Sequence, residues 1–174
     1  SDIFKLYGGT STGSIVSSGF NIPESLGNKK PKISGLDMVK IYTNHAIEIF
    51  PPEVHDHVPG VHISCKLKKA NSMLNFKYQN TGLKNVLNQY MGEYKMDELL
   101  NECIVFATEC HDEYTVKFKS KDYSKLQIKD ACLASASAPT YLPQVHLEHQ
   151  GKNMTLVDGG VTMNNPAEYV YDYA

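Results

Sequence analysis

Gly9-Thr10-Ser11-Thr12-Gly13 follows a short apolar run, Ile3-Phe4-Lys5-Leu6-Tyr7. The five residues fit Gly-x-Ser-x-Gly, the sharp turn from a strand into a helix that presents a serine hydroxyl for nucleophilic attack. A helix is expected to begin at residues 14–16 and to weaken at Gly19. This stretch therefore indicates a strand–turn–helix unit, and the chemistry that suits it is acyl transfer through a serine ester.

Composition sets limits on the class of protein. The 174 residues are 41% hydrophobic and 21% charged, which is ordinary for one globular domain with a real core. A net charge of -2 gives no reason to expect nucleic acid as a partner. All 17 basic residues are lysines, so no guanidinium clamp is available. The cysteine spacing fits neither a redox nor a zinc motif, and we expect reduced thiols. The printed sequence shows no signal peptide and no transmembrane segment.

Apolar periodicity predicts helices and strands in alternation. Helices are expected at 36–50, capped by Ser34 and ended by Pro51-Pro52, at 82–91, at 96–100 as a single turn, at 128–138 before Pro139, and from the cap Asn165-Pro166 toward Ala174. Strands are expected at 104–108, at 114–118 in a hairpin with it, at 154–157 and, more weakly, at 61–65. Alternation of this kind predicts an α/β fold with a parallel or mixed sheet covered on both faces.

A serine nucleophile needs a base within hydrogen-bond reach. No histidine follows Asp158, as the usual serine–acid–histidine order would require. His146 and His149 lie in a polar stretch that we expect to be an exposed loop, so a conventional Ser-His-Asp esterase is a minor alternative. His55-Asp56-His57 could suggest a metal, but a solvated surface loop is the favoured interpretation, and no metal site is predicted.

Asp158 is the better candidate for the base. It ends an apolar strand and is followed by Gly159-Gly160. Ser11 also follows a strand, and the carboxyl ends of parallel strands gather at one edge of a sheet. A partly buried carboxylate there could accept the serine proton directly. Taken alone, Asp-Gly-Gly is also compatible with a simple turn.

Three motifs occur together and in order: Gly-Thr-Ser-Thr-Gly-Ser at 9–14, Ala-Ser-Ala-Pro-Thr-Tyr-Leu-Pro at 136–143, and Val-Asp-Gly-Gly-Val-Thr-Met-Asn-Asn-Pro-Ala at 157–167. In this combination, and with the stretch 36–51, the chain resembles the patatin-like phospholipase family. The resemblance implies a three-layer α/β fold, with a central, mostly parallel sheet and helices on both faces. It implies that residues 1–174 form a single patatin-like catalytic domain.

The resemblance also implies a function. The family's pattern makes the protein a lipid acyl hydrolase of the phospholipase A type, which cleaves esters of membrane lipids through a serine acyl-enzyme. Ser11 would be the nucleophile and Asp158 the general base, without a histidine. The N–H of Thr12 would be an oxyanion donor. Around these two side chains, the nucleophile turn (Gly9, Thr10, Thr12, Gly13) and the supporting residues Gly159, Gly160 and Pro139 complete the expected site.

The resemblance also implies a substrate class and a place of action. We expect phospholipid or another acyl lipid as substrate, a peripheral membrane surface as the place of action, and no cofactor. A cytoplasmic protein and a secreted effector acting at membranes both fit the sequence.

One departure from the family's pattern stands out. The family carries a glycine-rich oxyanion loop, Gly-Gly-Gly-x-Arg/Lys-Gly, before the nucleophile, whereas the ten residues that precede Ser11 contain no such loop. We therefore expect a domain that is incomplete at its N-terminus, and also at its C-terminus. The alternative is a catalytically silent lipid-binding or interaction module of the same fold.

Overall fold

The first strand runs directly into the first helix. In the computed structural model, which describes residues 4–51 and 76–174, β1 (Leu6–Thr10) and α1 (Thr12–Gly19) are separated only by Ser11. The predicted strand–turn–helix unit is confirmed, but the strand lies later than expected, because Gly8 and Gly9 belong to β1. A Cβ atom on Gly8 would lie 2.3 Å from Val170 Cγ2, and one on Gly9 would lie 2.1 Å from the carbonyl oxygen of Gly13. The two glycines therefore allow β1 to lie close to Val170 on one side and to Gly13 on the other.

The sheet is mixed and open. Its other strands are β2 (Glu102–Glu109), β3 (Thr115–Lys119), β4 (Val145–His149) and β5 (Lys152–Asp158). The strand order is β1-β2-β5-β4, and β3 also pairs with β2. β1 and β2 are parallel, whereas the β2–β3, β2–β5 and β4–β5 pairs are antiparallel. The α/β class is confirmed, and β1–β2 is the parallel pair among the described strands.

Two strand ends meet on the same side of β2. Thr10, the last residue of β1, pairs with Phe106 of β2. Asp158, the last residue of β5, pairs with the next residue, Ala107, whose other side is occupied by β3. Because β1 runs parallel to β2 and β5 runs antiparallel to it, their C-terminal ends point toward each other. The structure therefore brings Ser11 and Asp158 together end to end, and not along one edge of a parallel sheet as expected.

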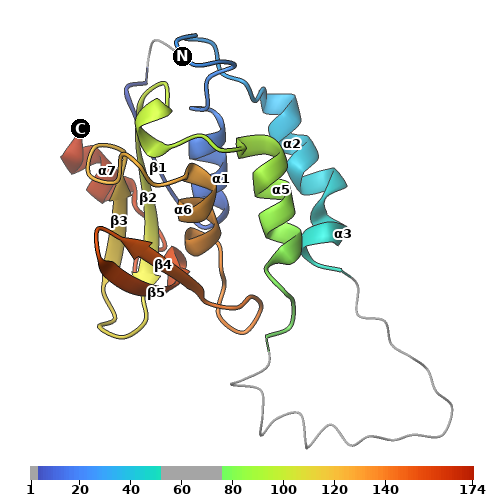
Figure 1. The fold of residues 1–174 in the computed structure, drawn as a ribbon, viewed down its shortest axis with the longest axis vertical. Helices are drawn as coiled ribbons and strands as arrows, with labels where there is room; N and C mark the ends of the chain where they lie inside the picture. Colours follow the sequence, from blue (N-terminus) through green and yellow to red (C-terminus); the bar gives the residue numbers. More distant parts are fainter. Residues whose placement is uncertain (1–3, 52–75) are drawn as a thin grey trace, which may run out of the picture.

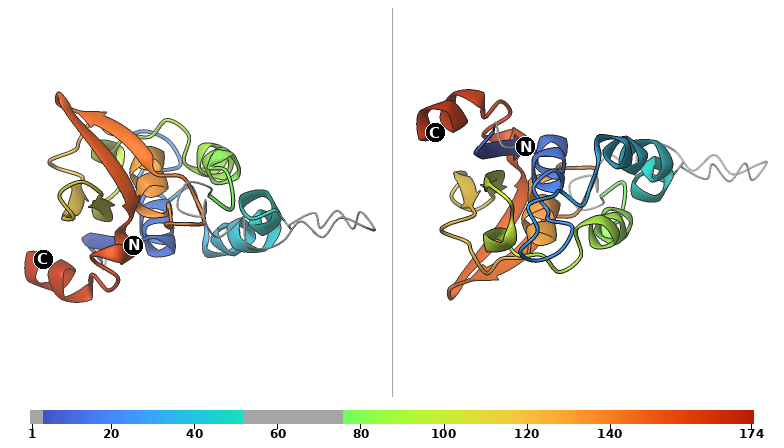
Figure 2. Two further views of the ribbon diagram at one scale, coloured as in Figure 1. Left: turned by 90° about the horizontal axis from the view of Figure 1, so that it is seen from below. Right: turned by 90° about the horizontal axis from the view of Figure 1, so that it is seen from above.

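Helices cover both faces of this sheet. α1 and α6 (Ile128–Ser135) pack on one face, and α7 (Ala167–Tyr173) packs on the other, beside β1 (Figures 1 and 2). A further group lies outside α1 and α6: α2 (Gly35–Asn44), α3 (Ala46–Ile49) and α5 (Thr81–Met91). The predicted helices on both faces are confirmed. The apolar core lies between the sheet and these helices, and its largest fully buried side chains include Phe106 and Phe118.

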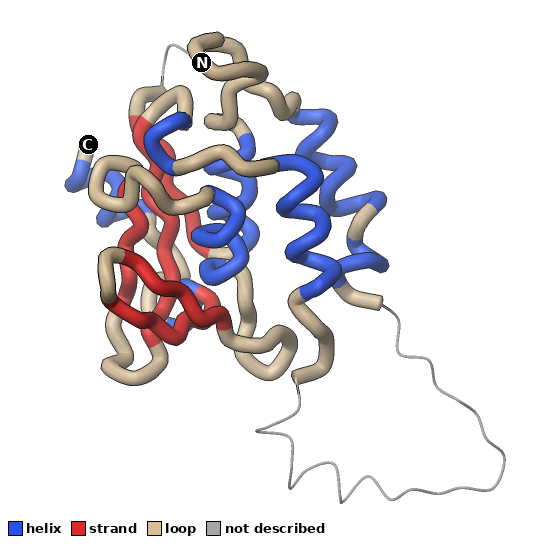
Figure 3. The backbone as a smooth tube through the Cα atoms, in the orientation of Figure 1, coloured by secondary structure: helices blue, strands red, loops and turns tan. Residues whose placement is uncertain are grey.

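Two predicted helices are shorter or broken in the structure (Figure 3). The helix expected at 36–50 is divided into α2 and α3 at His45, whose imidazole Nε2 lies 3.2 Å from the hydroxyl of Tyr90 on α5. The Ser34 cap is confirmed: its hydroxyl accepts the backbone N–H of Asp37. The helix expected at 128–138 ends at Ser135, because the N–H of Ser137 bonds to the carbonyl of Ala134 and that of Ala138 to Ala136, so the helical hydrogen-bond pattern stops there.

The C-terminal helix begins one residue later than expected. Pro166 is its N-cap, and the side chain of Asn165 accepts the N–H of Ala167. The helix expected at 82–91 is confirmed as α5, and the turn expected at 96–100 is a 3₁₀ helix, η1 (Met96–Glu98). A second 3₁₀ turn, η2 (Gly159–Val161), follows β5.

One segment expected to be a loop is a strand, and two other predictions lie outside the described residues. Residues 145–149 are strand β4 and not a loop, because Val145 and Leu147 alternate with polar side chains and are partly buried against the core. The strand expected at 61–65 and the His55-Asp56-His57 cluster fall within residues 52–75, outside the described ranges. Among the helices that the structure describes, none is long and apolar enough to cross a membrane.

Candidate active site

Ser11 occupies a strained backbone position. Its φ of 55° and ψ of -125° lie in a region that side-chain-bearing residues rarely adopt, at a cost of about 1–3 kcal/mol. Three hydrogen bonds hold it there. Its N–H donates to the hydroxyl of Ser135 over 2.9 Å, and its carbonyl oxygen accepts both the N–H and the hydroxyl of Ser14, over 2.9 and 2.6 Å. The turn therefore presents the Ser11 hydroxyl in one fixed direction.

That hydroxyl donates to Asp158. The distance from Ser11 Oγ to Asp158 Oδ2 is 2.6 Å, and the aspartate is 7% exposed. The other carboxylate oxygen, Oδ1, accepts the N–H of Gly160 over 2.7 Å. The Asp158 backbone is held as well, since its N–H donates to Ser137 and its carbonyl accepts the hydroxyl of Thr108. The carboxylate is thus oriented on both sides and directed at the serine.

The two glycines after Asp158 are explained by packing. A Cβ atom on Gly159 would lie 2.1 Å from the carbonyl oxygen of Phe106, and one on Gly160 would lie 3.0 Å from Asp158 Oδ1. The chain can therefore turn this tightly after β5, and place an N–H on the carboxylate, only with small residues. Asp-Gly-Gly therefore forms a turn, as one interpretation of the sequence predicted, and this turn also orients the carboxylate.

The start of α1 offers a donor for negative charge. Thr12 is its first residue, where a backbone N–H has no acceptor within the helix and the helix dipole is positive. The N–H of Ser11, in contrast, is already bound to Ser135. The carbonyl oxygen of Thr12 accepts a hydrogen bond from the hydroxyl of Tyr42 over 3.3 Å. Burial raises the pKa of Tyr42 to about 12, so that this hydroxyl stays protonated.

The side chain of Thr10 points away from the Ser11 hydroxyl, and its own hydroxyl donates to the carbonyl of Met163.

An apolar cavity of about 190 Å³ opens beside Ser11 and Thr12. Its other lining residues come from α1, α2, α3, α5 and the segment after α6: Ile15, Tyr42, Ala46, Ile49, Phe50, Leu83, Ala136 and Ala138. Pro139, expected near the dyad, is exposed and follows this lining. Gly13, on the first turn of α1, is also exposed. The cavity can accept an apolar group attached to an ester at Ser11.

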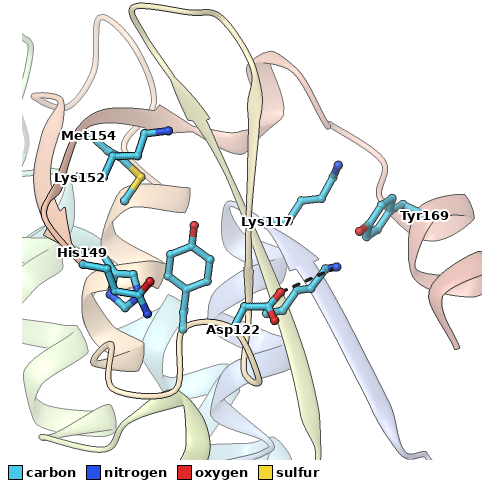
Figure 4. Close-up of a pocket in the computed structure, with 9 residues that line it drawn as sticks. Lys117, Asp122, His149, Lys152, Met154 and Tyr169 are labelled. Atoms are coloured by element: carbon cyan, nitrogen blue, oxygen red, sulfur yellow. Dashed lines mark ion pairs between the residues drawn. The ribbon is translucent and has the colours of Figure 1, made fainter.

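A larger and more polar pocket, of about 490 Å³, shares no residue with this cavity. Figure 4 shows His149 and Lys152, from the β4–β5 hairpin, on one side of it and Lys117 and Tyr169 on the other. Neither Ser11 nor Asp158 lines it, so its size does not make it the site of serine chemistry.

The two histidines considered as bases have other contacts. His146 Nδ1 lies 3.2 Å from the hydroxyl of Thr155, and the ring of His149 lies 4.6 Å from that of Tyr123. The acceptor for the Ser11 hydroxyl is Asp158. Within residues 4–51 and 76–174, no cluster of histidine, cysteine and acidic residues is suited to a metal ion.

Sequence reasoning missed Ser135, Ser137 and Tyr42 as members of the site. The first two lie in a run of small residues, 134–138, and small residues are also typical of a helix that only packs closely on a sheet. Both serines are fully buried, and each makes a hydrogen bond to Ser11 or Asp158.

A strand that turns sharply into a helix at a serine is a feature of hydrolases with an α/β fold. The chain belongs to the patatin-like phospholipase family, whose model matches residues 1–171. The resemblance noted from the three motifs is therefore confirmed.

Individual relatives are distant but cover nearly the whole chain. Patatin-like protein 2 of Arabidopsis thaliana is 29% identical over an alignment of 176 positions, which covers 95% of this chain and 41% of that protein. Patatin-like protein 1 of the same plant is 26% identical, over 95% of this chain and 40% of that protein. A potato (Solanum tuberosum) relative named "Probable inactive patatin-3-Kuras 1" is also 26% identical, over 95% and 42%. The chain thus spans about two fifths of the length of these relatives.

Proposed function

We propose that the full-length protein is a lipid acyl hydrolase of the phospholipase A type, with Ser11 as nucleophile and Asp158 as general base. The observation that carries the proposal is the 2.6 Å hydrogen bond from Ser11 Oγ to Asp158 Oδ2. The strained turn at Ser11, the adjacent apolar cavity and membership of the patatin-like phospholipase family support it.

The first half-reaction would proceed as follows. Asp158 Oδ2 takes the hydroxyl proton while Ser11 Oγ forms a bond to the ester carbonyl carbon. The negative charge that develops on the carbonyl oxygen is stabilised by the N–H of Thr12 and the positive end of α1. When the tetrahedral intermediate collapses, the C–O bond to the alcohol breaks. The leaving oxygen takes the proton back from Asp158, and the acyl group stays on Ser11.

In the second half-reaction, water takes the place of the serine as nucleophile and Ser11 Oγ becomes the leaving group. Asp158 accepts a proton from water, whose oxygen attacks the acyl carbon on Ser11. The intermediate collapses with release of the fatty acid, and Ser11 Oγ recovers its proton from Asp158. Only side chains, backbone N–H groups and water take part.

The cavity supports a lipid substrate. Its lining, which includes Ile49, Phe50 and Leu83, would hold the part of an acyl chain next to the ester, because burying apolar surface stabilises the complex by about 25 cal/mol per Å². A long acyl chain is presented by a membrane, so we propose that the protein acts at a membrane surface as a peripheral protein.

The alternative is a lipid-binding module of the same fold that does not turn substrate over. The observation in its favour is that, among the described residues, Thr12 N–H is the only backbone donor that we can assign to an oxyanion. The loss of one such donor typically reduces a rate by about 10²–10³. A fluorophosphonate probe distinguishes the two functions, because it labels Ser11 only if the serine is activated.

The test is fatty-acid release from phosphatidylcholine vesicles by the full-length protein. We expect Ser11→Ala to lower the rate by at least about 10³, because the variant cannot form the acyl-enzyme. Ser25→Ala, at an exposed serine outside the site, is the matched control and should keep the rate. An unchanged rate in Ser11→Ala would remove the basis for the proposal.

A further inference from the structure

Ser135, at the end of α6, has two hydrogen bonds that connect different parts of the fold. It is fully buried, and its hydroxyl donates to the carbonyl oxygen of Phe106 on β2 over 2.6 Å. The same oxygen accepts the N–H of Ser11 over 2.9 Å. A single hydroxyl therefore links the strained turn to the central strand.

The central strand, β2, also fixes the position of Asp158. Phe106 is followed on β2 by Ala107, the residue that pairs with Asp158. The relative placement of Ser11 and Asp158 thus depends on how each is fixed to β2. Ser11 is fixed to β2 in two ways. The preceding residue, Thr10, pairs with Phe106 of β2, and Ser135 connects the N–H of Ser11 itself to the carbonyl of Phe106.

The same segment reaches the aspartate. Two residues after Ser135, the carbonyl of Ser137 accepts the N–H of Asp158 over 2.9 Å. Residues 135 and 137 therefore hold one member each of the serine–aspartate pair, although the two members lie 147 positions apart in the sequence.

We propose that Ser135 is a positioning residue, whose hydroxyl holds Ser11 at the geometry in which its Oγ faces Asp158. The inference rests on the proposed function of Ser11. Ser135 acts through the Ser11 backbone and does not touch the substrate. Removal of its hydroxyl releases the Ser11 N–H and lets the turn relax from φ 55°. The attacking oxygen then spends less time in line with the carboxylate, which lowers kcat while KM changes little.

Ser120 provides a matched control. It is also a buried serine, 8% exposed, and its hydroxyl also accepts a backbone N–H of the sheet region, that of Cys103. Ser120→Ala therefore removes the same kind of hydrogen bond at a distance from the turn. Both alanine variants should lower the urea midpoint of unfolding, because each leaves a buried N–H unpaired.

The experiment compares the rate of fluorophosphonate labelling of Ser11, kcat and KM in the full-length protein. We expect Ser135→Ala to lower the labelling rate and kcat by about 10- to 100-fold. Ser120→Ala should stay within about twofold of the unmodified protein. Ser135→Thr, which keeps a hydroxyl, should recover most of the loss. Ser135→Cys keeps the size of the side chain but bonds weakly, so it should resemble Ser135→Ala and serves if that variant does not fold.

Amide hydrogen exchange at Ser11 provides a second readout that does not need activity. Exchange of the Ser11 N–H should be faster in Ser135→Ala or Ser135→Cys than in Ser120→Ala. Equal exchange and equal labelling in the Ser135 and Ser120 variants would overturn the inference. If the unmodified protein is not labelled at all, the proposed function fails, while the exchange of the Ser11 N–H still decides whether Ser135 positions the turn.

Discussion

The hydroxyl of Ser11 has a carboxylate as its hydrogen-bond acceptor, where the familiar serine hydrolases have an imidazole. Such a pair has only one group to accept the proton, return it to the leaving alcohol and then activate water. In the proposed reaction, everything that orients Asp158, including the N–H of Gly160 and the carbonyl of Ser137, would act on both half-reactions.

Asp158→Asn tests this dependence. The amide has nearly the same shape, and its oxygen can still accept the N–H of Gly160, so the fold should be kept. An amide cannot take the serine proton, and kcat should fall by roughly 10²–10⁴ with little change in KM. Steady-state hydrolysis of a soluble ester measures both constants. Asp172→Asn, on an exposed residue of α7, is the control, and activity of Asp158→Asn equal to that of the control would exclude a role as base.

The two glycines of Gly-x-Ser-x-Gly are predicted to differ in how well they tolerate alanine, although both belong to the same motif. A Cβ atom on Gly9 would meet the Gly13 carbonyl at 2.1 Å, whereas one on Gly13 meets nothing within 4 Å. Gly9→Ala should therefore destabilise the protein by about 1–3 kcal/mol. Gly13→Ala should be neutral or stabilise it by up to about 1 kcal/mol. Urea unfolding of both variants measures the difference, and equal losses would contradict the packing described for this turn.

At the scale of elements, α2 begins with a cap that depends on pH. The hydroxyl of Ser34, and then Lys40, lower the pKa of Asp37 to about 2. Because the folded pKa lies below the unfolded value of about 3.9, the stabilisation is present above that pH and is lost as the pH falls toward about 2. The urea midpoint of Ser34→Ala should lie below that of the unmodified protein near neutral pH. The difference should shrink as the pH falls through this window, and a constant difference would contradict the assignment.

α3 forms one wall of the apolar cavity, and this predicts a change in acyl selectivity. Ala46 is exposed at the protein surface and also lines the cavity, so Ala46→Phe should narrow it without disturbing the core. We expect the kcat/KM ratio for long over short acyl esters to fall by roughly tenfold, since about 1.4 kcal/mol of lost contact has that effect. Ile47→Phe, on the next residue, does not line the cavity and is the control. The cavity would not be the acyl site if both variants kept the original ratio.

At the scale of the whole molecule, the candidate site joins the two ends of the described chain. Ser11 follows β1 and Asp158 ends β5, and they meet because the two strands approach each other along β2. The site therefore requires that both β1 and β5 are paired with β2. The same sheet supports α6, whose last residue, Ser135, bonds to the Ser11 N–H.

Much of this arrangement could be predicted from the sequence. The serine turn has a local motif, Asp158 ends an apolar strand before two glycines, and α5 has an unbroken apolar stripe from Leu83 to Met91. These signals are local, and periodicity was enough to locate the helix and the strands. The pairing of Ser11 with Asp158, in contrast, was predicted from the resemblance of the three motifs to the family.

What the sequence did not reveal depends on contacts between distant segments. β4 has polar residues at alternate positions and looks like a loop until β5 lies beside it. At the break at His45, the imidazole contacts the hydroxyl of Tyr90, which lies 45 positions away in the sequence. In the sequence, Ser135 looks like any small residue of a tightly packed helix, and only the structure shows that its hydroxyl accepts the N–H of Ser11.

The central claim, that Ser11 is acylated with Asp158 as its base, is tested most directly by trapping the acyl-enzyme. The full-length protein is mixed with a p-nitrophenyl ester, quenched and analysed by mass spectrometry of its peptides. The account predicts one acyl group, on Ser11, that forms at least about 10² times more slowly in Asp158→Asn. An acyl group on a different residue, or equally fast acylation of Ser11 in Asp158→Asn, would contradict it.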